Sequence, residues 1–419
     1  MFRNIIETIL SKGLSALCNL FILLITAKYL GAEGRGEMAV VVLGIAVIGI
    51  FQNILSGSVL TYLVPKFSTS ALATAAVVWN ALIALLLAPL LTVSGLYPQE
   101  YFGDLLILSF LQGGITLIQS ILLGKEQIGK QNIMEVSKAF TTALFLLVFM
   151  VVLQEHSLSS VIDTFYCSYI LVFLTGCFFL YPYLKREKHL HSGFTEVLHH
   201  LFKYGIQMQL NNISQMINYR FCFYLIEKKL GMAALGVFSV ATSLVEMVWI
   251  VCKSVSNIHY SKTVNITDKE LGTRFTIQLS KLSFLLTLPV LAVLLLIPDS
   301  IFLWIFGKEF HNLTPLLISM SPGVLFLAFF TILNHHFSGT GKNMVNLSGS
   351  VLGNIFTIAA GWILIPAWGN IGGGIATSIG YFVMLCYFTG RFTSTNQLNI
   401  SWLYTPLKQL KQIFNLKNY

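Results

Sequence analysis

Charged and amide side chains inside otherwise apolar stretches are the groups in this sequence that could do chemistry. Glu246 and Lys253 lie in one such stretch, at a spacing that places both on nearly the same face of a helix. At 1.5 Å per residue, Glu246 lies about 20 Å beyond Ala233, where the stretch begins. A carboxylate at that depth is costly without a partner, so we expect Glu246 and Lys253 to pair or to share a cavity.

A row of polar residues follows the preceding apolar stretch. Its members recur at intervals of three to four residues and so form one stripe on a helix: Gln207, Asn211, Ser214, Gln215 and Asn218. Such a stripe can bond neighbouring helices or line a wet cavity. Its length, and the polar residues Glu7, Ser11 and Lys12 in the first apolar stretch, favour the cavity.

The remaining ionisable groups in apolar stretches can be explained by simple structural roles. Arg220 is expected about 25 Å above Lys203, near enough to the outer interface for its side chain to reach it. Lys253 is expected near the inner end of its stretch, so both cations could be simple anchors. Glu135 and Lys138, three positions apart, are predicted to pair with each other.

The composition places these groups in a membrane protein. Hydrophobic residues make up 55% of the chain and charged residues 10%, with a mean hydropathy of +0.76, whereas soluble domains carry about 25% charged residues. Helical spans need about 20 apolar residues, and stretches of that length follow one another along the chain. Neither the cysteines nor the histidines show the spacing of a metal site, so no metal is expected.

We predict an all-α polytopic membrane protein with about twelve transmembrane helices, because a barrel would show short alternating segments instead. The expected spans are 5–30, 37–64, 71–96, 102–124, 131–153, 160–184, 201–227, 233–259, 274–297, 312–337, 344–367 and 370–392.

The distribution of basic residues predicts the topology. Of the 26 lysines and arginines, 17 fall on one side of the predicted spans and five on the other, and the positive-inside rule makes the richer side cytoplasmic. Both termini are therefore expected in the cytoplasm. The net charge of +9 is explained by this excess facing anionic lipid, and no nucleic-acid partner is expected.

One turn occurs twice in the sequence. "YLGAEGRGEMAV" (29–40) returns as "KLGMAALGVFSV" (229–240), with Gly31 and Gly36 matched by Gly231 and Gly236. Arg35 has no counterpart, because Leu235 takes its place, and we interpret it as an interface anchor.

Further matches extend the repeat. At the same offset of 200, Glu7 matches Gln207, Lys12 matches Asn212 and Asn53 matches Lys253. Two shorter echoes are "FGD" (102–104) with "FGK" (306–308), and "IGKQN" (128–132) with "TGKNM" (340–344).

The repeat predicts two six-helix bundles that enter the membrane in the same direction and surround a central cavity. The expected units are 1–190, 191–395 and a cytoplasmic amphipathic basic tail, 396–419, lying in the interface.

A glycine-lysine motif invites a false reading. "GKEQIGKQ" (124–131) has the G-x-x-x-x-G-K spacing of a phosphate-binding loop. Gln131 stands where that loop needs a hydroxyl for magnesium, and no strand precedes the motif. We interpret it as a tight cytoplasmic turn, and we expect no enzyme.

Three stretches carry a resemblance to a known family. "SKGLSALCNLFILLITAKYLGAEGRGEMAVVV", "LGMAALGVFSVATSLVEMV" and "IFGKEFHNLTPLLISMSPGVLFLAFFTILNHHFSGTGKNMVNLSGSVLGNIFTI" resemble bacterial polysaccharide biosynthesis proteins. These are the O-antigen and capsular-repeat flippases of the multidrug/oligosaccharidyl-lipid/polysaccharide exporter superfamily. The resemblance covers essentially the whole chain.

The resemblance implies a central cavity lined by the first, second, seventh and eighth spans. It implies a flippase of the bacterial inner membrane that moves an undecaprenyl-diphosphate-linked oligosaccharide from the inner to the outer leaflet by alternating access. Basic residues would attract the diphosphate, and Lys12 and Lys253 match that role best, with Arg220 third. Gln207, Asn211, Gln215, Asn218 and Asn53 are the further candidate cavity contacts, and Glu246 and Glu7 are candidates for ion coupling or charge pairing.

Several alternatives stay open. The chain could be a cation-coupled drug or metabolite exporter of the same superfamily, or a scaffold without transport activity in a glycan assembly complex. The expected partners are the lipid-linked substrate and membrane lipids, with a glycan polymerase and glycosyltransferases as further candidates. No cofactor is expected, and the choice among sodium, protons and the membrane potential as the driving force is open.

The topology gives a first testable prediction. A cysteine introduced at Lys188, in a connection that should be cytoplasmic, is expected to resist an impermeant thiol reagent added to intact cells. The same cysteine should react once the cells are permeabilised. Labelling from outside intact cells would reverse the predicted orientation.

Overall fold

The computed structural model describes residues 2–185, 194–263, 268–399 and 402, and every regular element in these ranges is a helix. Nine of the described helices are long and apolar enough to cross a membrane. Two of these nine, Leu10–Gln52 and Met344–Thr395, have 43 and 52 residues, enough for two crossings each. The described chain is therefore an all-α, multi-pass membrane protein, as predicted.

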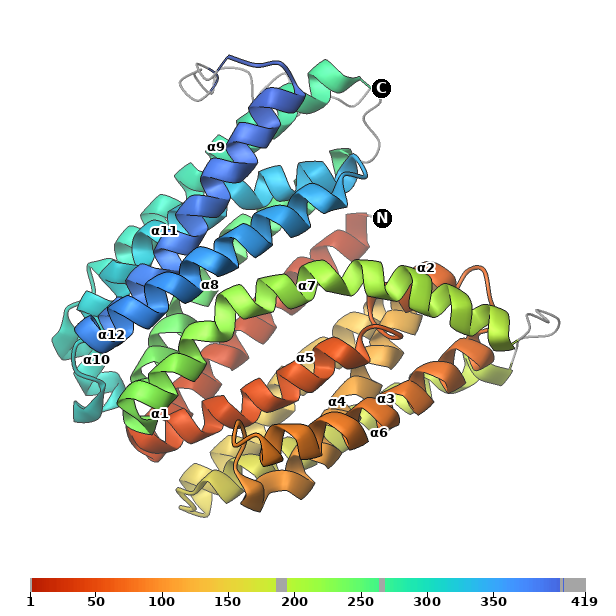
Figure 1. Ribbon diagram of the computed structural model, residues 1–419. Helices are drawn as coiled ribbons and strands as arrows, with labels where there is room; N and C mark the ends of the chain where they lie inside the picture. Colours follow the sequence, from red (N-terminus) through yellow and green to blue (C-terminus); the bar gives the residue numbers. More distant parts are fainter. Residues whose placement is uncertain (1, 186–193, 264–267, 400–401, 403–419) are drawn as a thin grey trace. The chain divides into compact units, whose positions relative to one another are not determined.

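The helix α1 (Phe2–Gln52) contains the first two predicted spans. They meet at Gly31, whose backbone torsions (φ 68°, ψ −171°) are not helical, and Figure 1 shows the sharp bend that results. Glycine alone adopts such torsions readily. Arg35 is 9% exposed and donates hydrogen bonds to Thr26 Oγ1 (3.3 Å) and Met38 Sδ (3.0 Å). It braces this bend from within the protein, so its interpretation as an interface anchor is wrong.

Four further long helices complete the first half of the chain: α3 (Thr69–Val93), α4 (Phe102–Gly124), α5 (Ile128–Leu146), which continues through a π-helical turn to Val152, and α6 (Leu158–Lys185). They match the predicted spans to within a few residues. The helix α5 packs on α1 and α6, and α4 packs on α3 and α6, as can be followed in Figure 1.

The second span is interrupted, which the sequence did not indicate. We expected one helix over 37–64, but α1 ends at Gln52 and a short helix, α2 (Ser58–Leu63), begins only after Gly57, which has a φ of 61°. Asn53, Ser56 and Gly57 lie at the break, but apolar residues continue on both sides, so the whole stretch resembled one span. Within the first unit, this unwound segment packs so closely on α7 (Phe194–Leu230) that a Cβ added to Gly205 would lie 1.8 Å from the Ile54 carbonyl oxygen.

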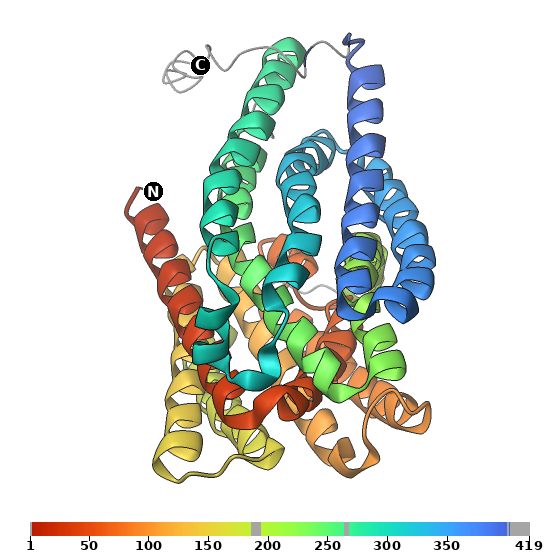
Figure 2. The same ribbon diagram turned by 90° about the vertical axis from the view of Figure 1, so that its left-hand side faces the viewer.

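The second half repeats the pattern of long helices: the second part of α7, then α8 (Met232–Thr263), α9 (Lys269–Leu295), α11 (Leu313–Gly339) and α12 (Asn343–Thr395). Short helices α10 (Asp299–Phe306) and η3 (Lys308–Phe310) connect α9 to α11. The helix α12 bends at Gly369 (φ 60°, ψ −141°), and Figure 2 shows its two limbs. With the limbs of α1 and α12 counted separately, the described residues contain twelve long helical segments.

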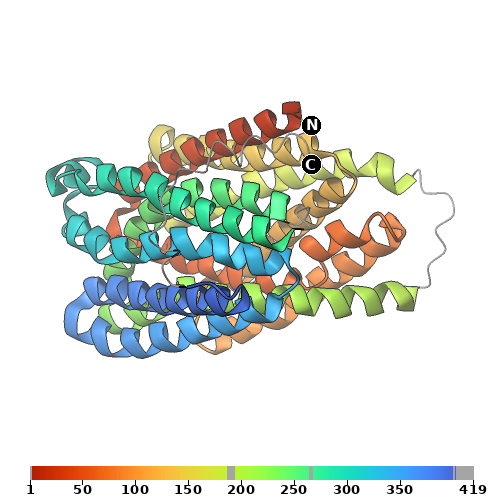
Figure 3. The same ribbon diagram turned by 90° about the horizontal axis from the view of Figure 1, so that it is seen from above.

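The helix α11 forms the centre of this second bundle. It contacts α8, α9 and α12, and Figure 3 shows the teal and blue helices α9, α11 and α12 side by side. A stack of buried aromatic rings fills the contact between α11 and α12, where Phe330 and Phe388 lie 5.6 Å apart. These rings bury apolar area on both helices and fix their spacing.

The backbone supports the internal repeat at the turn that suggested it. Gly231 has a φ of 89° between α7 and α8, as Gly31 has a positive φ between the first two spans. The predicted equivalence of "FGD" (102–104) and "FGK" (306–308) is wrong, because Gly103 lies inside α4 whereas Gly307 follows α10.

The second short repeat, "IGKQN" (128–132) with "TGKNM" (340–344), is present in the structure but is shifted by three residues. The helices α4 and α11 end at Gly124 and Gly339 in the same capping motif, with left-handed residues at Glu126 (φ 59°) and Gly341 (φ 74°). The paired capping bonds, Gln127 N–H to the Leu122 carbonyl and Lys342 N–H to the Phe337 carbonyl, define a Schellman motif. The structural offset is thus 215, where the letters suggested 212.

The chain divides into two compact units, Met1–Ile213 and Ser214–Tyr419, so that α7 contributes to both. The predicted functional units 1–190, 191–395 and 396–419 stay a prediction. Of the predicted tail, 403–419 lies outside the described residues. Trp402 is 4% exposed, and its indole donates to Thr393 Oγ1 on α12 at 3.0 Å.

The bend at Gly31 gives a prediction on stability. Gly31→Ala should lower the free energy of unfolding by about 1–3 kcal/mol, because the added Cβ makes the observed torsions costly. The measurement is the unfolding of the purified protein in detergent.

Gly13→Ala is the matched control. Gly13 lies in the same helix, with nothing within 4 Å of an added Cβ, so this change should be neutral or slightly stabilising. Equal losses in both variants would contradict the role assigned to Gly31.

Candidate functional site

An ion pair joins α7 and α8 within the second unit. Arg220 Nη2 lies 3.0 Å from Glu246 Oε1, with the two side chains 34% and 31% exposed. The guanidinium also lies over the Phe223 ring, 4.9 Å from its centroid. Glu246 is therefore neutralised by the preceding helix, and the predicted pairing with Lys253 is wrong, whereas the cavity that the two residues could share stays a prediction. Helical spacing on α8 indicated a face for Glu246 but could not indicate which neighbouring helix that face meets.

Of the three cations predicted to bind the diphosphate, Lys253 and Lys12 have no carboxylate partner in the described part of the chain. Both are exposed, and Lys253 Nζ lies 5.5 Å from the centroid of the Trp249 ring on its own helix. Lys12 is ten residues from the start of α1, and Lys253 is ten residues from the end of α8. Each ammonium is thus about 15 Å from the helix end that should be cytoplasmic.

The polar row on α7 serves two kinds of contact. Ser214 is buried and accepts hydrogen bonds from Asn354 Nδ2 on α12, at 2.8 Å to its carbonyl and 2.9 Å to its hydroxyl. Asn218 is 1% exposed and donates to Met384 Sδ at 3.5 Å, while its Oδ1 has no partner in the described residues. Both residues therefore bond α7 to α12. Gln215 is half-buried, and the side chains of Gln207 and Asn211 lie outside the described residues.

Gln209 is a residue that the sequence analysis missed. It is 3% exposed, and its Nε2 donates to the Asn53 carbonyl oxygen at 3.1 Å, while its Oε1 accepts from Asn212. It thereby satisfies a carbonyl at the break in the second span. Gln209 does not belong to the predicted stripe on α7. The only sign of its role in the sequence was a polar amide within an apolar stretch.

Two more predicted residues lie in the first unit. The half-buried Asn53 lines a cavity between α1, α4, α5 and α6. Glu7, on α1, is half-buried, and its carboxylate lies 4.0 Å from where a Cβ on Gly129 would stand. The predicted pair of Glu135 with Lys138 is wrong, because Gln131 donates to Glu135 while Lys138 donates to Gln112 on α4.

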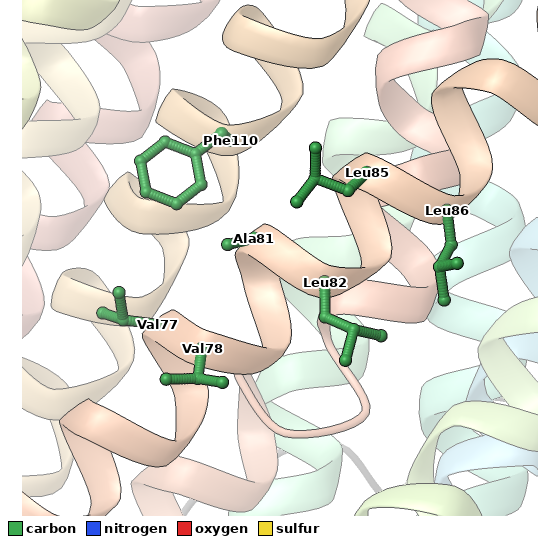
Figure 4. Close-up of a pocket in the computed structure, with 7 residues that line it drawn as sticks. All are labelled: Val77, Val78, Ala81, Leu82, Leu85, Leu86 and Phe110. Atoms are coloured by element: carbon green, nitrogen blue, oxygen red, sulfur yellow. The ribbon is translucent and has the colours of Figure 1, made fainter.

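A second hollow on the first unit offers no chemistry. It measures about 550 Å³ and lies against α3 and α4, and Figure 4 shows the side chains that line it: Val77, Val78, Ala81, Leu82, Leu85, Leu86 and Phe110. All are apolar, so this groove suits the hydrocarbon of a lipid and has no group to recognise a head group.

The chain is similar to several known proteins. The family model "Polysaccharide biosynthesis protein" matches residues 61–315, more than half of the chain. An uncharacterized membrane protein of Methanocaldococcus jannaschii is 21% identical over 310 residues, covering 70% of this chain. This chain spans about 60% of the length of that relative.

Solved structures share the fold at low identity. The lipid II flippase MurJ matches with a TM-score of 0.74 at 15% identity, covering 100% of this chain and 94% of its own. A multidrug resistance transporter of the MATE family, in the MOP superfamily, matches with a TM-score of 0.73 at 14% identity, covering 93% and 99%.

These matches agree with the all-α fold described above. The chain belongs to the polysaccharide biosynthesis protein family and is a multi-pass membrane protein.

Proposed function

We propose that this protein is a flippase that moves an undecaprenyl-diphosphate-linked oligosaccharide from the inner to the outer leaflet of a bacterial inner membrane, by alternating access. The observation that carries this proposal is the pair of exposed ammonium groups on Lys12 and Lys253, which have no carboxylate partners in the described residues. Each lysine lies ten residues from a helix end that is expected to be cytoplasmic. An exposed ammonium without a carboxylate partner can bind an anionic ligand.

The chemistry of the head group fits these residues. A diphosphate presents several charged oxygens, and ammonium groups bind such oxygens through charge-assisted hydrogen bonds. Gln207, Asn211, Gln215, Asn218 and Asn53 are the amides proposed to contact the sugars. The polyprenyl chain needs only an apolar surface and can stay in the lipid throughout.

Arg220 is a weaker candidate for binding the diphosphate than the two lysines. Its guanidinium is already neutralised by Glu246 at 3.0 Å, so binding a phosphate there requires the ion pair to open. Glu246 is proposed as the counter-charge of Arg220, and coupling to a sodium or proton gradient is its second candidate role.

A drug or metabolite exporter is the alternative within the superfamily, and the fold match to a MATE family transporter favours it equally. An organic cation needs an exposed carboxylate, whereas Glu246 is already paired. A glycan assembly scaffold with no transport activity is the second alternative. Export of cationic dyes would support the first, and the absence of transfer in vesicles that contain only this protein would support the second.

The first prediction from the proposed function concerns the two lysines. Lys12→Ala together with Lys253→Ala should lower the rate of head-group transfer in proteoliposomes by about tenfold or more, because each charge-assisted bond contributes about 1.5–3 kcal/mol. Transfer is measured as the fraction of a fluorescent glycan that an impermeant quencher cannot reach.

Lys66→Ala is the control, because Lys66 Nζ lies 3.6 Å from the centroid of the Tyr62 ring and has no assigned role in the transport path. This variant should transfer at the normal rate. Undiminished transfer by the double variant, at matched protein levels, would overturn the diphosphate assignment.

The second prediction separates the two roles of Glu246. Glu246→Gln should destabilise the protein because it leaves Arg220 unpaired, and adding Arg220→Gln should restore part of the lost stability. Thermal unfolding of the two single variants and the double variant measures this. If Glu246 only pairs with Arg220, transfer by the double variant keeps its dependence on sodium and proton gradients. Loss of that dependence would assign the coupling role to Glu246.

A further inference from the structure

A polar cavity of about 270 Å³ lies inside the first bundle, between α1, α4, α5 and α6. Its apolar wall comes from the second limb of α1, while its polar groups come from the break after α1 and from α4, α5 and α6: Asn53, Gln112, Thr116, Lys138 and Tyr169. Lys138 is the one formally charged residue among the lining residues. The cavity lies wholly within the first unit, and its lining includes neither Lys12 nor Lys253.

The contacts of Lys138 favour its charged form. Its Nζ donates to Gln112 Oε1 and lies 4.6 Å from the centroid of the Tyr169 ring. An amide oxygen and an aromatic face both stabilise an ammonium. Gln112 is held in this orientation, because its Nε2 donates to Thr116 Oγ1 at 3.2 Å. An ammonium has three hydrogens to donate, so part of its capacity stays open toward the cavity.

No carboxylate among the described residues lies within 4 Å of this ammonium. Glu135, one turn away on α5, accepts from Gln131 Nε2 at 3.3 Å. On α4, Asp104 is eight residues from Gln112, about 12 Å along the helix, and it accepts from Tyr166 on α6. The remaining acids of the cavity's helices are not among the lining residues: Glu7, Glu33 and Glu37 on α1, and Asp163 on α6.

Two buried amides stand beside the same wall. Gln52 and Asn80 are each 1% exposed, and a Cβ added to Gly113, which lines the cavity, would lie 2.5 Å from Asn80 Nδ2. Asn80 Nδ2, Asn80 Oδ1 and Gln52 Oε1 have no hydrogen-bond partner in the described residues. The two amide groups themselves fill the space where a Cβ on Gly113 would stand, so the protein behind this wall of the cavity is polar.

We propose that this cavity is a binding site for a small monovalent inorganic anion such as chloride, held by the Lys138 ammonium with the Asn53 amide beside it. One fixed positive charge in an apolar bundle requires one counter-charge, and the cavity has room for a halide ion with a few water molecules. This proposal does not depend on the identity of the transported substrate.

The test uses the full chain, purified in detergent, with sodium chloride exchanged for sodium gluconate at constant ionic strength. Chloride should raise the Tm saturably, by about 2 °C when its concentration is ten times its Kd. Lys138→Gln should abolish this response. Gln112→Glu should abolish it too, because the new carboxylate supplies the counter-charge in place of the ion.

Lys130→Gln is the matched control on the same helix. Lys130 has no role in the cavity, because its Nζ donates to the Tyr183 hydroxyl at 3.1 Å. This variant should therefore keep the chloride response. If Lys138→Gln fails to fold, Gln112→Glu still decides the outcome.

Three results would overturn the proposal. The first is no saturable chloride response in the unmodified chain, and the second is an equal response in Gln112→Glu. The third is a response to pyrophosphate with none to chloride, which would assign the cavity to a diphosphate head group.

Discussion

Backbone hydrogen bonds must be satisfied inside the protein wherever the chain crosses lipid, and this constraint governs the first unit. The break after Gln52 frees backbone carbonyls in the middle of an apolar stretch. The Trp79 indole donates to the Phe51 carbonyl at 2.9 Å, and Gln209 donates to the Asn53 carbonyl at 3.1 Å. The unwound segment is tolerable because α3 and α7 supply these donors, so side chains distant in sequence hold the polar segment in place.

The same constraint applies to charge. Each ionisable group in an apolar helix must find a partner, a wet cavity or a ligand. Arg220 and Glu246 find each other, and Arg35 is held at the Gly31 bend. Lys12 and Lys253 are exposed, and Lys138 faces a cavity. Lys12, Lys253 and Lys138 have no carboxylate partner among the described residues, and we propose that they serve anions.

The sequence predicted the helices better than their contacts. Apolar length and glycine punctuation located all twelve long segments, and the repeated turn identified Gly31 and Gly231 as equivalent bends, because both signals are local. The partner of Glu246 and the role of Gln209 depend on which faces of different helices meet, which spacing within one helix cannot indicate. The break at 53–57 was missed because Asn53, Ser56 and Gly57 were taken as polar positions within one continuous span, and its stabilising donors come from other parts of the chain.

A comparison of two substrates in vesicles that contain only this protein tests the central claim most directly. One glycan is carried on undecaprenyl diphosphate and the other, identical glycan on an uncharged polyprenyl lipid, and the transbilayer rate of each is measured. If exposed cations on α1 and α8 recognise the head group, the diphosphate substrate moves at least about tenfold faster. Equal rates, or no movement of either substrate, would contradict the account.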